Sequence, residues 1–384
     1  MRRRILFLIS SLNVGGAERQ LVNLASGLDP RRWEIRVVCT HDAGALGLEL
    51  ERGGIPVVSL GRNSRGIVSV LSALVAEVRR FEPHVIHAYL VSPQLYALLV
   101  RPLLPRVPLV LGIRSSFVDV RHYGIATRML YRAVEVLGKR ADGYIVNSQT
   151  GAELYTARGF DRRKMAVVPN GIRAEMFEPR PEKSAWARRE FGCSVGDRVV
   201  AVVGTLEHMK GHDIFVDAAE AVARAAPSTR FVLIGRDSTP QGALIRKRVD
   251  ALGLTGRFSF LGHRDDVADL LNGVDVVCLP SIGEGFPNVV AESMCMEIPC
   301  VVSDVGDAAR IAGGTGWVVP PRDSRKLADA IVEALGIPAE ARRERGRNAR
   351  RRIVQHFAVD EMVRQTERAY RAVLGELLEP LPTT

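Results

Sequence analysis

The sequence contains no apolar run long enough to cross a membrane. No window reaches the roughly 18 uninterrupted apolar residues that a spanning helix needs, and the best candidate, Leu95 to Leu104, is broken by Arg101 and Pro102. The apolar run at residues 5–9 is too short for a signal peptide, because polar and charged residues follow it at once. We therefore expect a buried first strand there and no spanning helix.

Cysteine is scarce, and its placement shows no framework. The chain has five cysteines in 384 residues, none in a CxxC pair and none with a histidine at metal-ligand spacing. An odd number without a pattern argues against a disulfide scaffold and indicates free thiols in a reducing compartment. We therefore expect a cytoplasmic protein in which the cysteines are small buried residues: Cys39, Cys193, Cys278, Cys295 and Cys300.

The two standard phosphate-binding fingerprints are also absent. The segment Ser10–Glu18 follows the first apolar run and opens a helical pattern, yet it has neither GxGxxG nor a P-loop lysine. Its glycines, Gly15 and Gly16, still let the backbone approach a ligand closely, and a helix N-terminus offers amides to an anion. A tight turn that merely needs glycine is the alternative.

The charge is ordinary in amount and positive in sign. Charged residues make up 25% of the chain, and the formal net charge is +10. A positive balance favours nucleotide phosphates, nucleic acid or an anionic membrane as partners without choosing among them. The basic stretch Arg342–Arg352 is interleaved with Glu and Ala, which is typical of a solvated helix face, so we expect no nucleic acid partner.

What the chain does contain is a repeated alternation of short apolar runs and helical patterns. For 384 residues, at roughly 100–200 residues per domain, two domains are expected. Strands that alternate with helices indicate βαβ units, and continuous apolar strands indicate a parallel sheet covered on both faces. In the first half we expect strands at 4–10, 35–39, 56–60, 85–87, 109–111 and 143–146, with helices at 18–28 and 67–81.

The alternation restarts after residues 169–181, a segment rich in Pro, Gly and Arg that we expect to be the linker. The second half therefore predicts a second doubly wound domain, followed by a tail helix at 359–378. Its expected strands are 199–204, 231–235, 258–261, 274–279 and 300–303, and its expected helices are 213–225, 241–252, 267–271, 288–296 and 326–335.

Two segments of the second half carry residues that suit a phosphorylated sugar. In Gly204–Asp213 a strand ends in glycine and Lys210 stands before a helix, where a lysine can neutralise a phosphate. In Pro280–Met294, Glu284 lies in a glycine-flanked loop and Glu292 lies on the following helix. Carboxylates accept hydrogen bonds from hydroxyls, including the diol of a ribose. A surface lysine and solvated acids are the alternatives, although two carboxylates around a Gly-Phe-Pro loop need partners if they are buried.

In this order, these segments resemble the retaining glycosyltransferases of family 4, whose GT-B fold has two doubly wound, Rossmann-like α/β domains facing a cleft. The resemblance covers nearly the whole chain. It implies an N-terminal acceptor-side domain at 1–172, a nucleotide-sugar-binding domain at 173–355, and a crossover helix at 356–384 that returns to the first domain. It rests on five segments taken jointly: Gly15–Glu18, Pro169–Ile172, Gly204–Gly211, Glu284–Glu292 and Thr315–Pro321.

The resemblance implies a retaining transfer from a nucleotide-sugar, most often a UDP-sugar, to a glycan or lipid-linked acceptor, with no metal and no cofactor. By analogy, Glu292 binds the ribose, Glu284 and the loop amides hold the moving sugar, and Lys210 neutralises the diphosphate. The implied catalytic residues are Glu284, Lys210, His87 and Arg114. The implied donor-binding residues are Gly15, Gly16, Gly204, Thr205, Lys210, Arg236, His263, Arg264, Glu284, Gly285, Phe286, Pro287, Asn288, Val289 and Glu292.

Two positions depart from the family's pattern. Thr205 stands where the family usually has an arginine of the cationic clamp on the diphosphate, so Lys210, helix dipoles or Arg236 must stabilise the leaving group. The family's N-terminal site histidine is not evident, and Arg114 stands near its place, facing the donor sugar or the acceptor. His87 is the other candidate, with a core histidine as the alternative.

Two other functions stay open at this point. One is a nucleotide-sugar epimerase on a similar two-domain scaffold, against which the Glu-Gly-Phe-Pro-Asn loop argues. The other is a non-catalytic relative that binds sugar nucleotides, which Thr205 keeps open.

A membrane surface is a further candidate partner. The stretch Arg121–Arg140 carries basic residues among apolar ones at helical spacing, which is typical of a basic amphipathic helix at an anionic membrane. A domain helix with its apolar face in the core is the alternative. The hypothesis places the protein at the inner face of the plasma membrane, in the synthesis of a bacterial surface polysaccharide or glycolipid.

Overall fold

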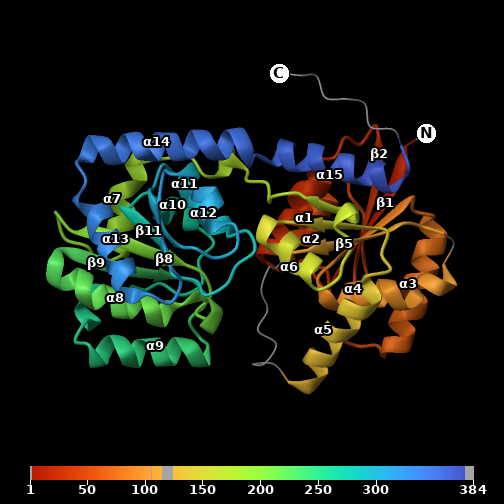
Figure 1. Cartoon of the computed structure of the whole chain (residues 1–384), viewed down its shortest axis with the longest axis horizontal. Coiled ribbons are helices and arrows are strands. Elements are labelled where there is room, and N and C mark those ends of the chain that lie inside the picture. Colours follow the sequence, from red (N-terminus) through yellow and green to blue (C-terminus); the bar gives the residue numbers. More distant parts are fainter. Residues whose placement is uncertain (1, 105, 115–123, 377–384) are drawn as a thin grey trace. The chain divides into compact units, whose positions relative to one another are not determined.

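A computed structural model describes residues 2–104, 106–114 and 124–376, and the chain divides into two compact units (Figure 1). Unit 1 comprises residues 1–171 and 359–384, and unit 2 comprises residues 172–358. Each unit is a parallel sheet with helices on both faces, so the expected α/β class is confirmed.

In the described part of unit 1, seven parallel strands form the sheet: β1 (Arg3–Ile9), β2 (Trp33–Cys39), β3 (Val57–Ser59), β4 (Val85–Tyr89), β5 (Leu109–Ile113), β6 (Gly143–Val146) and β7 (Met165–Val167). The helices are α1 (Gly16–Gly27), α2 (Gly44–Arg52), α3 (Ile67–Phe81), α4 (Val91–Val100), α5 (Ile125–Gly138), α6 (Gln149–Ala157) and α15 (Val359–Val373). The strand order is β3-β2-β1-β4-β5-β6-β7.

The sequence of β1 is continuously apolar because both faces of this inner strand are buried. Ile5 and Phe7 of β1 pack with residues of α1, α2 and α15 on one face of the sheet. Leu6 and Leu8 pack with residues of α3 and α4 on the other face. All four side chains are fully buried, and burial of each contributes about 1.5–3 kcal/mol.

In the described part of unit 2, six parallel strands form the sheet: β8 (Arg198–Val203), β9 (Thr229–Ile234), β10 (Phe258–Phe260), β11 (Val276–Leu279), β12 (Cys300–Ser303) and β13 (Trp317–Val319). The helices are α7 (Ser184–Glu190), α8 (His212–Ala225), α9 (Pro240–Ala251), α10 (Val267–Leu271), α11 (Asn288–Cys295), α12 (Ala308–Ala312), α13 (Ser324–Gly336) and α14 (Ala339–His356). The strand order is β10-β9-β8-β11-β12-β13. Alternate residues of β8 face α7, α10, α11 and α14 on one side and α8, α9 and α13 on the other.

Two edge strands depart from the expectation. β7 was not expected, and β13 lies inside the segment Thr315–Pro321, for which no strand was expected. Each has three residues and stands at the end of its sheet. Three residues show no period of their own, and the equally short edge strands β3 and β10 were expected only as parts of the slightly longer runs 56–60 and 258–261.

Two expected helices reach beyond the described residues. The basic amphipathic stretch forms α5 from Ile125, whereas Arg121 and His122 lie outside the described residues. The tail helix α15 ends at Val373, and residues 377–384 lie outside the described part. None of the described helices is long and apolar enough to span a membrane.

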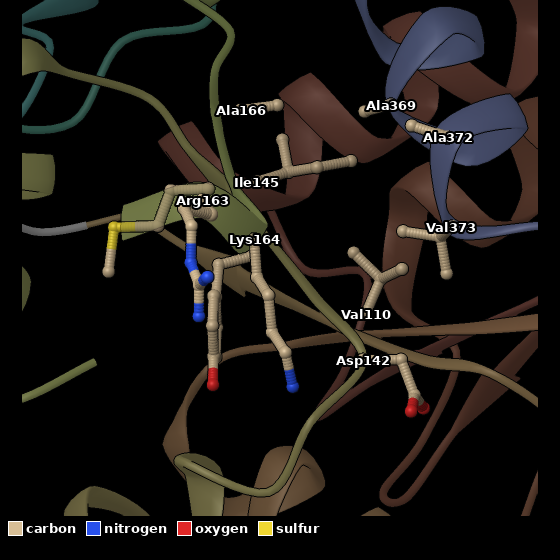
Figure 2. A pocket seen from close by; sticks show the side chains of 11 residues that line it. Val110, Asp142, Ile145, Arg163, Lys164, Ala166, Ala369, Ala372 and Val373 are labelled. Carbon is tan, nitrogen blue, oxygen red and sulfur yellow. The ribbon is translucent and has the colours of Figure 1, made fainter. Parts of the chain in front are cut away.

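A cavity of about 260 Å³ lies at the amino ends of β6 and β7, beneath α15 (Figure 2). Figure 2 shows apolar side chains of α15, such as Val373, across from Val110 and Ile145 of the sheet. Asp142 and Lys164 stand at its polar end. Ligands of open α/β sheets bind beyond the carboxyl ends of the strands, so this cavity is at the opposite edge from the expected site.

Candidate active site

The sheet of unit 2 has its topological switch point between β8 and β11. These strands are neighbours, but the helix after β8 packs on one face of the sheet and the helix after β11 packs on the other. Ligands of open α/β sheets bind at such a point, because the diverging connections leave a crevice at the carboxyl edge. The two connections are the segments 204–213 and 280–294 singled out in the sequence.

An ion pair joins these two connections. The ammonium Nζ of Lys210 lies 2.8 Å from Glu284 Oε1, and the Ser281 hydroxyl donates to the same oxygen at 2.7 Å. The Lys210 side chain is 37% exposed and that of Glu284 is 11% exposed. An ammonium has three N–H groups, so Lys210 can hold Glu284 and still donate to a ligand oxygen.

Two glycines allow the loops around this pair to pack closely. Gly211 has φ +64°, and a Cβ there would lie 2.0 Å from the Pro280 carbonyl oxygen. Gly306 has φ +56°, and its Cβ would lie 2.4 Å from the Gly285 carbonyl oxygen, which accepts a hydrogen bond of 2.9 Å from the Asp307 amide. A side chain at either glycine would displace a loop that carries one partner of the ion pair.

The start of α11 faces the same edge. Phe286 is buried and packs against the Phe357 ring at 5.5 Å, which anchors the loop from the core side. Pro287 is the N-cap of α11, and its side chain offers no capping hydrogen bond. The positive end of the helix dipole therefore points toward the loop. The half-buried Glu292 follows one turn after Asn288.

Three glycines, Gly204, Gly235 and Gly262, follow the carboxyl ends of β8, β9 and β10 and leave the backbone there without side chains. The Gly204 amide donates to the Ile234 carbonyl, and the Gly235 amide donates to the Gly262 carbonyl, both at 2.8 Å. A Cβ at Gly235 would lie 2.2 Å from the Gly204 carbonyl oxygen. The absence of side chains from these three positions lets a ligand approach the backbone.

The cations expected at this edge differ in how strongly they are held. Arg264 pairs with Asp266 at 2.7 Å and with Glu190 at 3.1 Å, and these hydrogen bonds raise the pKa of its guanidinium. Arg236 is exposed, with its Nη2 3.8 Å from Glu207 Oε1. His263 is also exposed, 3.4 Å from Asp265. Arg236 is therefore freer than Arg264 to turn toward an anion.

At the carboxyl edge of unit 1, the N-terminus of α1 already has an acidic neighbour. Gly15 is the N-cap, and a Cβ there would lie 2.3 Å from Glu18 Oε2. Burial raises the pKa of the Glu18 carboxyl, and its hydrogen bond to its own backbone amide lowers it. A phosphate that approaches Gly15 and Gly16 would compete with this carboxylate for the helix amides.

His87 is a core residue rather than an accessible catalytic group. Its side chain is fully buried, with Nδ1 2.7 Å from the Tyr370 hydroxyl and the ring 4.4 Å from that of Tyr89. Burial, followed by the charge of Arg114, lowers the pKa of the imidazole well below its usual value. This burial favours the alternative of a core histidine, and the catalytic role of His87 stays a prediction.

Arg114 lies at the end of β5 and is held by neutral oxygens. Its Nη2 donates to the Tyr89 hydroxyl at 2.6 Å and its Nη1 to Asn170 Oδ1 at 3.3 Å. The guanidinium also stacks over the Tyr89 ring at 4.5 Å. Next to Tyr89, Leu90 has φ +66°, a strained conformation that costs about 1–3 kcal/mol and is common at functional sites.

Each half of the chain matches a family model of glycosyltransferases. Residues 14–176 match the model of Glycosyltransferase Family 4, and residues 197–336 match the model of Glycosyl transferases group 1. Both matches are to models of glycosyltransferases, and together they span most of the chain.

Relatives of this chain include the D-inositol 3-phosphate glycosyltransferases of Mycobacterium bovis and Mycobacterium tuberculosis, each 31% identical over 249 residues. The match takes in 62% of this chain and 50% of each relative, so the chain spans about half the length of the curated relatives it matches.

Solved structures share the fold over nearly the whole chain. Anabaena HepE in complex with UDP-glucose has a TM-score of 0.84 at 24% identity, over 96% of this chain and 99% of that one. WaaG, a glycosyltransferase involved in lipopolysaccharide biosynthesis, has a TM-score of 0.75 at 15% identity, over 97% and 100%. At these identities the likeness establishes the fold.

Most of the expected donor-binding residues lie at the carboxyl edge of one sheet. In unit 2 these are Gly204, Thr205, Lys210, Arg236, His263, Arg264, Glu284, Gly285, Phe286, Pro287, Asn288, Val289 and Glu292. Gly15, Gly16, His87 and Arg114 belong to unit 1. Sequence reasoning missed the partners of these residues: Ser281, Tyr89, Asn170 and Tyr370. Ser281 and Asn170 stand inside motifs already singled out, whereas the contact of Tyr370 has no sequence signal.

Proposed function

We propose that this glycosyltransferase moves a sugar from a UDP-sugar to a glycan or lipid-linked acceptor, with retention of the anomeric configuration and without a metal ion. The observation that carries the proposal is the contact of Lys210 and Ser281 with Glu284 at the switch point of unit 2. It brings together a cation that can bind phosphate and a carboxylate, held in place, that can accept hydrogen bonds from sugar hydroxyls. The UDP-glucose complex of HepE supports the choice of base.

The proposed roles follow from the position of each side chain. Glu292, on α11, binds the ribose hydroxyls, because a carboxylate accepts from both hydroxyls of a diol. The loop from Gly285 to Asn288 holds the transferred sugar against Glu284. Lys210 and the positive end of α11 stabilise the departing diphosphate, where negative charge develops.

Retention is proposed as front-face transfer. Glu284 Oε1 is already occupied by Lys210 and Ser281, which suits a residue that orients hydroxyls better than a covalent nucleophile. Thr205 adds no charge, so Arg236 is proposed as the second cation on the leaving group.

Incubation with labelled UDP-sugars tests this function. Slow release of free sugar, without metal and in the presence of EDTA, is expected of a transferase that lacks its acceptor. Interconversion of sugars would show an epimerase instead, and binding without any turnover would show a non-catalytic relative.

Peripheral attachment to an anionic membrane is proposed for α5. Ile125, Met129 and Val136 are 74%, 67% and 52% exposed. At 100° per residue they lie within about 40° of arc, beside Arg128 and Arg132 of the same helix. An exposed apolar stripe with basic flanks suits the surface of an anionic bilayer. This places the proposed reaction in the cytoplasm at the inner face of the plasma membrane, where a glycolipid or polysaccharide precursor is available.

A further inference from the structure

The guanidinium of Arg114 is partly buried, but it has no carboxylate partner among the described residues. Two other half-buried arginines of unit 1 do have one: Arg36 pairs with Glu77 at 2.5 Å, and Arg101 pairs with Asp142 at 2.8 Å. Among the described residues, the side chain of Arg114 donates hydrogen bonds to the hydroxyl of Tyr89 and the amide oxygen of Asn170. A buried charge is stable when an opposite charge compensates it, and the described part of the chain supplies no such charge for Arg114.

The groups around Arg114 fix its position but do not neutralise it. Tyr89, Asn170 and Asn147 are buried, and the Asn147 amide donates to the backbone carbonyl of Arg114 at 3.3 Å. The Arg114 Nε is buried and has no partner in the described part of the chain. Burial lowers the pKa of His87, and the charge of Arg114 lowers it further. Burial raises the pKa of Tyr89, and the charge of Arg114 opposes this rise. The guanidinium of Arg114 is therefore held by buried, neutral groups.

The position of Arg114 makes it a substrate residue rather than a structural one. It follows β5, at the carboxyl edge of unit 1, beside the strained Leu90. A planar guanidinium binds the oxygens of a phosphate or carboxylate in a forked geometry. The long hydrogen bond to Asn170 leaves this face of the guanidinium free to shift toward a stronger acceptor.

We propose that Arg114 binds an oxyanion of the acceptor, a phosphate ester or a comparable group, and that Tyr89 and Asn170 position the guanidinium for it. The acceptor is therefore an anionic molecule. This inference rests on the proposed function, because it takes unit 1 as the acceptor side.

The experiment measures binding of inorganic phosphate to the full chain by calorimetry at constant ionic strength, with and without saturating UDP. The variants are Arg114→Gln, Arg114→Lys and, as a matched control, Arg158→Gln, because Arg158 also lies over a tyrosine ring in unit 1. We expect phosphate to bind the wild type equally well with UDP present. Arg114→Gln should weaken phosphate binding roughly 10- to 100-fold, Arg114→Lys less, and Arg158→Gln not at all.

UDP binding by each variant reports folding and the donor site separately. If UDP binds but phosphate does not bind the wild type, or if Arg114→Gln binds phosphate as well as the wild type, the inference is wrong while the proposed function stands. Displacement of phosphate by UDP would assign the anion to the donor diphosphate and would also overturn it. If the wild type does not bind UDP, the result contradicts the proposed function instead.

Discussion

Lys210 and Glu284 are 74 positions apart in the sequence, and a 2.8 Å ion pair joins them in space. One follows β8 and the other follows β11, so the pair bridges the point where the connections of the unit 2 sheet diverge. The sequence suggested two separate roles: Lys210 as a cation that neutralises the diphosphate, and Glu284 as a hydrogen-bond acceptor for the sugar hydroxyls. The contact joins the two side chains, so we expect a change in either to affect the other.

Replacement of Lys210 by Ala should lower the rate of UDP-sugar cleavage roughly 100- to 1000-fold, since a cation next to the developing charge is lost. Glu284 is also left with one fewer compensating partner. Steady-state hydrolysis of a labelled donor measures the effect. Lys183→Ala is the matched control, because Lys183 in unit 2 pairs with Asp269 at 3.3 Å and is similarly exposed. Equal rates for the two variants would show that Lys210 does not take part in donor cleavage.

Replacement of Glu292 by Ala should weaken UDP binding roughly 10- to 100-fold, because hydrogen bonds to a charged group are lost. Calorimetric titration with UDP measures this, and Glu220→Ala on α8 is the control for removal of an acidic side chain from unit 2. Unchanged affinity of the Glu292 variant would refute its assignment to the ribose.

The architecture was predictable because each central strand is buried on both faces and therefore reads as a continuous apolar run. The sequence of β1, Arg3–Ile9, is the clearest case. Glu284 and Glu292 were predictable as a pair because loop and helix follow one another in the chain. The edge strand β7 was not predicted, whereas the equally short edge strands β3 and β10 were, so strand length alone does not explain the miss.

The unit 1 residues show where sequence reasoning stops. His87 and Arg114 both looked like candidates at strand ends, and only packing separates them. His87 is enclosed because Tyr370 of α15 and Tyr89 of β4 cover it. Tyr370 is 283 positions away in the sequence, so no local pattern could indicate this contact.

Arg236→Ala should lower the rate of donor cleavage roughly 10- to 100-fold if Arg236 compensates for the uncharged Thr205. Introduction of Thr205→Arg into that variant should restore activity, because it supplies a cation after β8. Comparison of the two variants in the donor hydrolysis assay tests this. Arg224→Ala, an exposed arginine paired with Glu220, should have no effect. An inactive double variant would show that the lost charge at position 236 is not the cause.

His212 should make stability depend on pH. The side chain is buried, and burial, followed by the charge of Lys210, lowers its pKa from 6.5 to about 4. The unfolded chain therefore binds a proton that the folded chain does not bind between these two values, so stability is full above pH 6.5 and falls as the pH drops toward 4. The expected loss is about 1.4 kcal/mol per pH unit within this window.

His212→Leu should remove this dependence. Thermal unfolding at pH 7 and pH 5 measures it, as the difference between wild type and variant. We expect the wild type to lose more stability than His212→Leu on acidification, and we expect His263→Leu, at an exposed position, to behave like the wild type. Parallel losses in wild type and His212→Leu would contradict the assignment.

Replacement of Met129 by Asp should release the protein from anionic vesicles, because it introduces a negative charge into the exposed apolar stripe of α5. Sedimentation with vesicles of mixed anionic and neutral phospholipid measures the bound fraction. High salt should also reduce binding, since part of the attraction comes from the basic flanks. Val354→Asp is the matched control, because Val354 is an exposed apolar residue of α14 in unit 2. If the wild type fails to sediment, or if both variants lose binding equally, α5 is not the membrane contact. If only Met129→Asp dissociates, the apolar stripe rather than the net charge of the chain governs attachment.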